Sequence, residues 1–190
     1  MKKKVDYKDF DLRNIKLGKK EVHIKFFDLG QKNDIVTVDS DSQPHIDLIG
    51  ALAKLNEVFC RAIGLHSGWD FAREHNRKND EALKMAINEY KSEISRCHVT
   101  EFTSVGTDDD PAVKIKASLK CETGTISGIT STPIQHFGEE FLSDIDLASI
   151  IEEVRKEVWC FLYSDKRGND LFNQDVKDEE HVSGLNNKAV

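Results

Sequence analysis

The sequence lacks the segments that mark membrane and secreted proteins. Its apolar runs span only a few residues, and the N-terminus reads Met-Lys-Lys-Lys without an apolar core, so neither a membrane helix nor a signal peptide is predicted. The four cysteines are widely spaced and form no C-x-x-C pair, which argues against a disulfide framework and against a zinc ribbon. We therefore expect a cytoplasmic protein with free thiols.

Familiar catalytic motifs are missing as well. The chain contains no phosphate loop of the form G-x-x-x-x-G-K-S/T, no G-x-G-x-x-G, no G-x-S-x-G and no H-E-x-x-H. A metal site could draw on Cys97, His98 and Cys121, but successive residues of a strand point to opposite faces, so His98 would diverge from the cysteines. We expect no enzyme, no bound metal and no cofactor.

Charge is unevenly distributed along the 190 residues. The net charge of −7 argues against a protein whose whole surface binds phosphate backbones. Residues 1–38 nevertheless carry ten Lys or Arg against six Asp or Glu, whereas residues 139–157 carry seven acidic residues against two basic ones. A basic region and an acidic helix are therefore expected on different faces.

Apolar periodicity predicts an α+β fold. Partial alternation over residues 10–17, 22–26 and 35–38, interrupted by turn-forming residues, predicts a three-stranded meander. Apolar residues then recur at helical spacing between Pro44 and Gly64, which are typical residues for the start and the end of a helix. A second long amphipathic helix is predicted to begin in the manner of a capping box at Ser143 and to continue to Leu162.

The remaining segments complete the expected domain. Residues 69–96 are helical in composition, with a polar first half and a helix from about Asp80, and are predicted to be a helical insertion. Residues 124–130 predict a further short strand. From residue 165 the apolar periodicity disappears. We therefore expect one α+β domain over residues 1–164, with one antiparallel sheet packed by two long helices, followed by a flexible tail over residues 165–190.

The segment after the insertion predicts an antiparallel hairpin. Cys97–Val105 and Ala112–Glu122 flank the polar loop Gly106–Pro111. Pairing Val105 with Val113 sets Cys97 opposite Cys121 and makes one face mostly apolar. The other face of the sheet then carries His98, Phe102, Lys114, Lys116 and Lys120, and the same alternation in the second strand places His23, Lys25 and Phe27 outward.

Such a face has the composition of a platform for single-stranded nucleic acid, on which cations follow the backbone and aromatic rings stack on bases. The proposed binding residues are Lys25, Phe27, Phe102, Lys114, Lys116 and Lys120. Lysines on the wet face of an antiparallel sheet also prevent aggregation, and phenylalanines can lie beneath a helix, so an ordinary solvated face is the alternative. The binding hypothesis requires these residues on one uncovered surface.

The order of these elements resembles a group of small, largely uncharacterised proteins of tailed phages and prophages. The likeness covers residues 15–165: a meander, a helix opening with Pro44-His45-Ile46-Asp47-Leu48, a hairpin, the extended segment Thr130-Ser131-Thr132-Pro133-Ile134 and an acidic helix. Residues 69–96 are an insertion relative to that pattern. The resemblance implies a non-catalytic accessory protein of a phage or prophage, located in the host cytoplasm, and assigns no reaction.

The tail suggests a second class of function. Leu171 and Phe172 resemble the Leu-Phe end of peptides that bind the bacterial sliding clamp, although the upstream glutamine of such peptides is missing here. The ordinary alternative is that the pair packs back onto the terminal helix. The alternative function is accordingly a protein-interaction or inhibitory module, which binds a host or phage protein through its acidic C-terminal helix and Leu171-Phe172.

Overall fold

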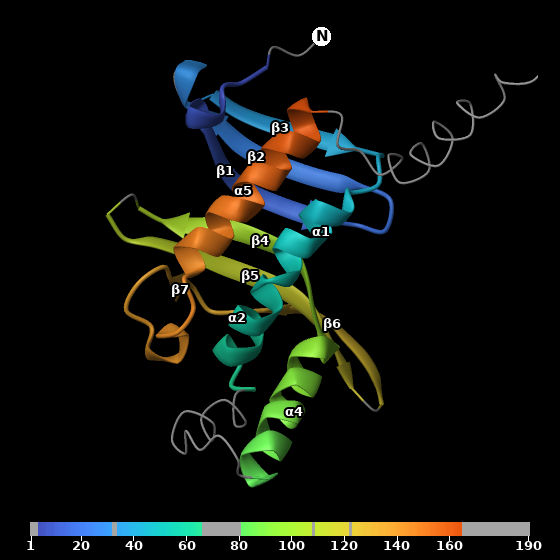
Figure 1. Ribbon diagram of the computed structural model, residues 1–190. Helices are drawn as coiled ribbons and strands as arrows, with labels where there is room; N and C mark the ends of the chain where they lie inside the picture. The colour runs from blue at the N-terminus through green and yellow to red at the C-terminus, as the bar shows by residue number, and fades with distance from the viewer. Residues whose placement is uncertain (1–3, 32–33, 66–80, 108, 122, 165–190) are drawn as a thin grey trace, which may run out of the picture.

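A computed structural model describes residues 4–31, 34–65, 81–107, 109–121 and 123–164 (Figure 1). The predicted tail over 165–190, with Leu171 and Phe172, and the first part of the predicted insertion lie outside the described residues. Within the described part of the chain, no helix is long and apolar enough to cross a membrane.

An antiparallel sheet forms the centre of the fold, in the strand order β3-β2-β1-β4-β5-β6, with a short seventh strand beside β5. Its strands are β1 (Phe10–Leu17), β2 (Val22–Asp28), β3 (Asp34–Ser40), β4 (Cys97–Gly106), β5 (Pro111–Cys121), β6 (Gly124–Thr130) and β7 (Ile134–Gln135). The order shows two consecutive meanders, β1–β3 and β4–β6, which meet through their first strands. The predicted α+β class, the first meander and the hairpin are confirmed.

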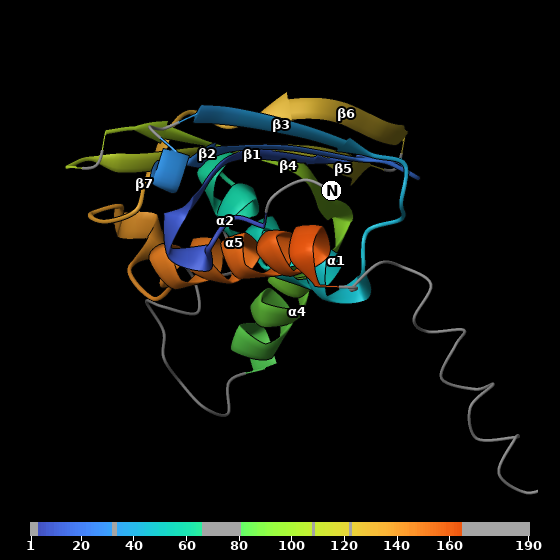
Figure 2. The same cartoon turned by 90° about the horizontal axis from the view of Figure 1, so that it is seen from above.

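The helices lie on one side of the sheet, and no described helix covers the other side (Figure 2). They are α1 (Ile46–Ala53), α2 (Leu55–Ala62), α4 (Glu81–Arg96) and α5 (Leu147–Tyr163). The helix predicted after Pro44 is confirmed as α1 and α2, which meet at Lys54, and α4 confirms the helix predicted from Asp80. The prediction of a cap at Ser143 is wrong, because Asp146 accepts the hydrogen bond from the Ser149 N–H at 3.0 Å and α5 begins after it.

The two meanders are joined by a short seam. Only three residue pairs link β1 to β4, and the central pair is Ile15 with Phe102. Asn14 reinforces this seam, because its side-chain amide donates to the Phe102 carbonyl at 3.1 Å and to the Thr103 hydroxyl at 2.8 Å. Each strand has a β-bulge beside the seam, between Leu12 and Asn14 in β1 and between Val99 and Glu101 in β4. Both strands therefore diverge where the seam ends.

The hydrophobic core lies between the sheet and the helices and draws on both meanders. The largest completely buried side chains include Phe10 and Phe26 of the first meander, Phe102 of the second, Phe59 of α2 and Phe161 of α5. Burial of each such ring contributes about 1.5–3 kcal/mol. The core therefore holds the two halves of the sheet together even though their hydrogen-bonded seam is short.

The buried guanidinium of Arg61 connects α2 to neighbouring segments through hydrogen bonds. Arg61 is only 3% exposed, and its Nε donates to the Tyr90 hydroxyl of α4 at 2.6 Å. Its terminal nitrogens donate to Glu57, to both oxygens of Asp144 and to the Phe141 carbonyl. Planar guanidinium groups suit such bidentate contacts. Arg61 thus ties α4 and the segment before α5 to the end of α2.

Candidate nucleic-acid interface

The open face is the side of the sheet opposite the helices. Its strands carry six basic side chains and three acidic ones, although the whole chain has a net charge of −7. The basic residues are Arg13, Lys16, Lys25, Lys114, Lys116 and Lys120, and the acidic residues are Asp11, Asp39 and Glu101. The charge of the protein is therefore segregated, with its positive excess on a surface that no described helix covers (Figure 2).

Strand register aligns these side chains in two rows across the sheet. One row runs from Lys25 through Asn14 and Thr103 to Lys114, each residue paired with the next. Since neighbouring strands lie about 4.8 Å apart, its two lysines are about 14 Å apart at the backbone. Among the described residues, no carboxylate forms an ion pair with either lysine.

The second row is partly neutralised. Lys16 lies opposite Glu101, and Glu101 lies opposite Lys116 and forms an ion pair with it at 4.0 Å. An exposed pair at this distance is weak and exchanges readily with other partners. Lys116 can therefore still contact a phosphate, but the first row offers the less compensated charge.

Phe27 supplies the aromatic ring of the open face. The Arg13 guanidinium lies over this ring, 4.7 Å from its centroid, and Arg13 also pairs with Asp11 at 2.6 Å. Ile35 of β3, directly opposite Phe27, is 59% exposed. A guanidinium plane and a half-buried ring next to an exposed aliphatic side chain make a surface on which a base can stack.

Phe102 does not lie on the open face, and the prediction that it points outward is wrong. Its side chain is completely buried and sits opposite Ile115 in the core. The bulge at Thr100 is the physical reason, because its extra residue reverses the side-chain alternation. Before the bulge the odd-numbered Cys97 and Val99 point inward, and after it the even-numbered Phe102 does. The predicted register is also off by one residue at the turn, where Val105 pairs with Ala112 rather than Val113.

The other five predicted residues, Lys25, Phe27, Lys114, Lys116 and Lys120, do share the open face. Arg13 and Lys16 belong to it as well and were not predicted. The sequence contains a signal for them. In β1 the apolar residues lie at positions 10, 12, 15 and 17, so the spacing of two changes to three after Leu12, and in β4 the positions 97, 99 and 102 show the same change. Each break marks a bulge.

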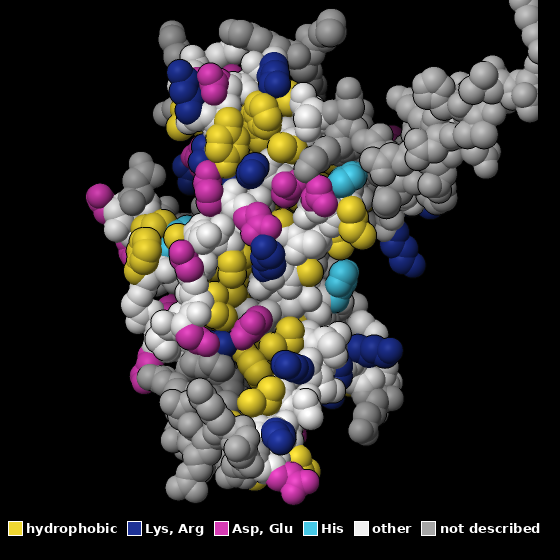
Figure 3. Space-filling view, viewed as in Figure 1, with side chains coloured by type: hydrophobic (Ala, Val, Ile, Leu, Met, Phe, Trp, Pro, Cys, Tyr) yellow, Lys and Arg dark blue, Asp and Glu magenta, His cyan; other side chains and the backbone are white. Residues whose placement is uncertain are grey.

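The acidic helix of the alternative function is largely engaged within the protein. Glu152 of α5 accepts a hydrogen bond from the Tyr7 hydroxyl and pairs with Arg155, while Glu153 accepts from Lys54 at 2.5 and 2.7 Å. Figure 3 shows acidic and basic side chains interspersed over the face that carries the helices. No observation on the described residues favours α5 as a docking surface for a basic partner.

The cysteines are not arranged as a metal site. Cys97 lies opposite Leu119 rather than Cys121, and the Cys60 thiol donates to the Leu65 carbonyl at 3.0 Å. The mutual influence of the Cys60 and Cys97 thiols raises the pKa of Cys60 and lowers that of Cys97. Within the described ranges, no group of three or more His, Cys, Asp or Glu side chains could hold a metal ion.

Two histidines are expected to titrate on opposite sides of the usual histidine pKa of 6.5. On the open face, the hydrogen bond to Asp39 at 2.6 Å raises the pKa of His23, whereas burial lowers the pKa of His136. Protonation of His23 thus adds stability that is complete below pH 6.5 and is lost as the pH rises through its folded-state pKa. For His136 the sign is reversed, since stability is lost as the pH falls below 6.5.

NMR titration of the ring protons measures both midpoints in one sample. The prediction is a midpoint above 6.5 for His23 and below 6.5 for His136. Asp39→Asn should bring the His23 midpoint back toward 6.5 and leave His136 unchanged. Equal midpoints in the wild type would contradict the assigned contacts.

Comparisons of the chain with protein-family models, with curated proteins and with solved structures find no match. The resemblance to phage proteins therefore stays a prediction.

Proposed function

We propose that the protein is a non-catalytic accessory protein that binds single-stranded nucleic acid through the open face. One observation carries the proposal: a negatively charged chain concentrates its basic strand residues on the one sheet face that no described helix covers. Phosphate backbones are bound chiefly through such cations, and binding releases counterions.

The preference for single strands follows from the shape and composition of the face. Phe27, Arg13 and Ile35 form the stacking corner of the surface, and stacking requires bases that are not enclosed in a duplex. The row from Lys25 to Lys114 crosses the strands next to this corner, so a bound strand would run across the sheet with its backbone along the lysines. Sequence preference would be slight, because stacking and phosphate contacts are shared by all bases.

Fluorescence anisotropy with labelled single-stranded and double-stranded oligonucleotides tests the proposal. Binding of the single strand is expected at low salt and should weaken as salt rises. Lys25→Glu/Lys114→Glu should weaken it by about tenfold or more, because two phosphate contacts become repulsive. Phe27→Ala should cost about 1–3 kcal/mol of binding free energy for the base that it stacks.

A matched control distinguishes the effect of charge on the open face from the effect of the net charge of the protein. Lys84→Glu/Lys91→Glu makes the same charge change on exposed positions of α4, on the other side of the sheet. This variant should bind nearly as well as the wild type. The proposal fails if no single-strand binding occurs at low salt, or if both double variants lose affinity equally.

A further inference from the structure

A cavity of about 600 Å³ lies beyond one end of the seam and is separate from the residues of the proposed nucleic-acid interface. It forms where β1 and β4 diverge after the pair Lys16 and Glu101, and α1 lies beside the gap. Leu17 of β1, Leu52 of α1 and Val99 of β4 line it. Its volume is within the usual range for sites that bind small molecules.

The walls of the cavity are held by regular structure. Leu52 and Val99 are 1% and 3% exposed, so their backbones are fixed by the core. The Val99 N–H, next to the bulge, donates to the side chain of Asn56 at 2.9 Å instead of to another strand. The bulge and its hydrogen bond keep β4 away from β1, so the cavity is built into the sheet.

Its lining has a distinct chemistry. The interior is mostly apolar, with Pro44 and the partly exposed Ile49 adding to the three residues above. In the part of the chain that the structure describes, no carboxylate lines it, although acidic residues outnumber basic ones in the chain. Lys19 lines it from the turn between β1 and β2, and no carboxylate forms an ion pair with Lys19 among the described residues.

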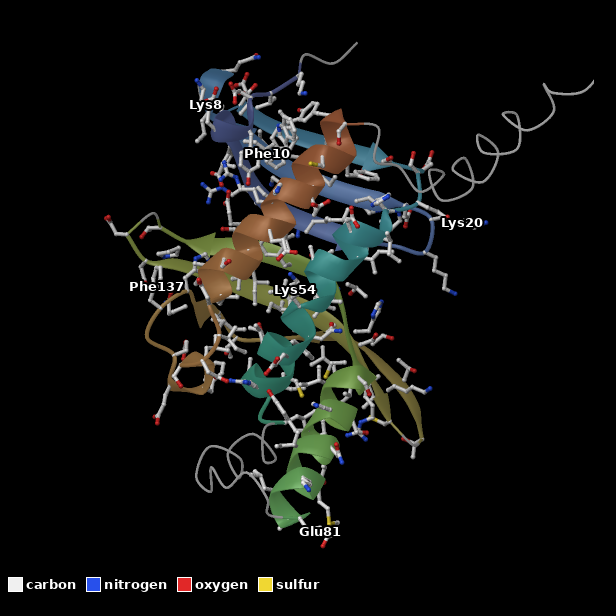
Figure 4. All side chains as sticks on the ribbon, viewed as in Figure 1. Lys8, Phe10, Lys20, Lys54, Glu81 and Phe137 are labelled. Carbon is white, nitrogen blue, oxygen red and sulfur yellow. The ribbon has the colours of Figure 1, made fainter. Side chains whose placement is uncertain are left out.

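We propose that this cavity binds a small amphipathic anion, a compound with an apolar aromatic or acyl body and a single anionic group. The apolar body occupies the space between Leu17, Leu52 and Val99, and the anionic group lies at Lys19. Burial of the apolar body provides most of the affinity, and the lysine provides orientation and a charge preference. Figure 4 shows Lys20, the neighbour of Lys19 in this turn, at the edge of the sheet and far from Lys8.

The structure offers a variant that blocks the cavity without disturbing the core. Ala53 is the exposed last residue of α1 and lines the cavity, so Ala53→Trp fills the space with an indole ring. Gly50 is exposed on the same helix and does not line the cavity, and a Cβ added there would meet no atom within 4 Å. Gly50→Trp is therefore the matched control, and Lys19→Glu against Lys8→Glu tests the charge.

Titration of the full chain with the fluorescent probe anilinonaphthalene sulfonate, an apolar aromatic anion, measures the affinity. The wild type should bind one probe molecule with a dissociation constant in the micromolar range. Ala53→Trp should weaken binding by about tenfold, Lys19→Glu by about threefold or more, and both controls should stay within about twofold. Circular dichroism melting of each variant confirms that the fold persists.

Several results would overturn the proposal. These are the absence of saturable binding, wild-type affinity in Ala53→Trp, and an equal loss in Gly50→Trp. Equal binding of a neutral probe of the same shape would remove the role of Lys19. Lys25→Glu/Lys114→Glu should leave probe binding unchanged. The proposal of this site and the proposal of the nucleic-acid interface can therefore be refuted independently.

Discussion

Replacement of Arg61 by alanine is expected to lower the free energy of unfolding by about 3 kcal/mol. Among the described residues, the variant loses four hydrogen bonds that link α2 to α4 and to the segment before α5, and a fifth to Glu57 within α2. It also removes the Arg61 cation from beside the carboxylates of Glu57 and Asp144. Because these side chains are 38% and 53% exposed, water compensates part of the loss, and the effect stays near the lower end for a broken buried ion pair.

Urea denaturation followed by circular dichroism measures this change. Arg96→Ala, which removes an exposed arginine from α4, should change stability by less than about 0.5 kcal/mol. The stability loss of Arg61→Lys should lie between those of Arg61→Ala and Arg96→Ala, since lysine keeps the charge but lacks the planar set of donors. An Arg61→Ala variant as stable as Arg96→Ala would show that the buried contacts contribute nothing net.

Phe102→Ala is expected to destabilise the protein by about 3–5 kcal/mol, because it leaves a cavity at the seam between the two meanders. The ring is completely buried, and the backbone carbonyl of the same residue accepts from Asn14. Phe27→Ala removes a half-buried ring from the open face and should cost about 1 kcal/mol or less. The two phenylalanines that the sequence placed on one surface should thus behave in opposite ways.

Denaturation and oligonucleotide binding together separate these roles. Phe27→Ala should bind single strands more weakly at nearly unchanged stability, whereas Phe102→Ala should lose binding only in proportion to its unfolded fraction. A Phe102→Ala variant of wild-type stability that no longer binds would place this ring in the interface and contradict the register described here.

Much of the fold could be predicted because it depends on local patterns. The alternation in residues 22–26 predicts β2 with Lys25 and Phe27 outward, and this was confirmed, since period-2 burial is a local property of a strand. The apolar stripes likewise predicted α1, α2, α4 and α5. The face parity of β5 was correct for Lys114, Lys116 and Lys120 because its inward positions, from Val113 to Leu119, alternate without a break.

The tertiary structure alone decided what joins these elements. The breaks in alternation mark the bulges at Arg13 and Thr100 locally, but they do not say which strands pair. The pairing of β1 with β4 joins distant parts of the chain, and the Asn14–Phe102 contact spans 88 residues. Likewise, the described partners of Arg61 outside α2 come from segments 29 to 83 residues away. The sequence by itself determined which residues form strands and helices and which sign of charge each segment carries. Which strands meet, where they diverge and which side chains share a surface depend on the packing of distant segments, which no local period encodes.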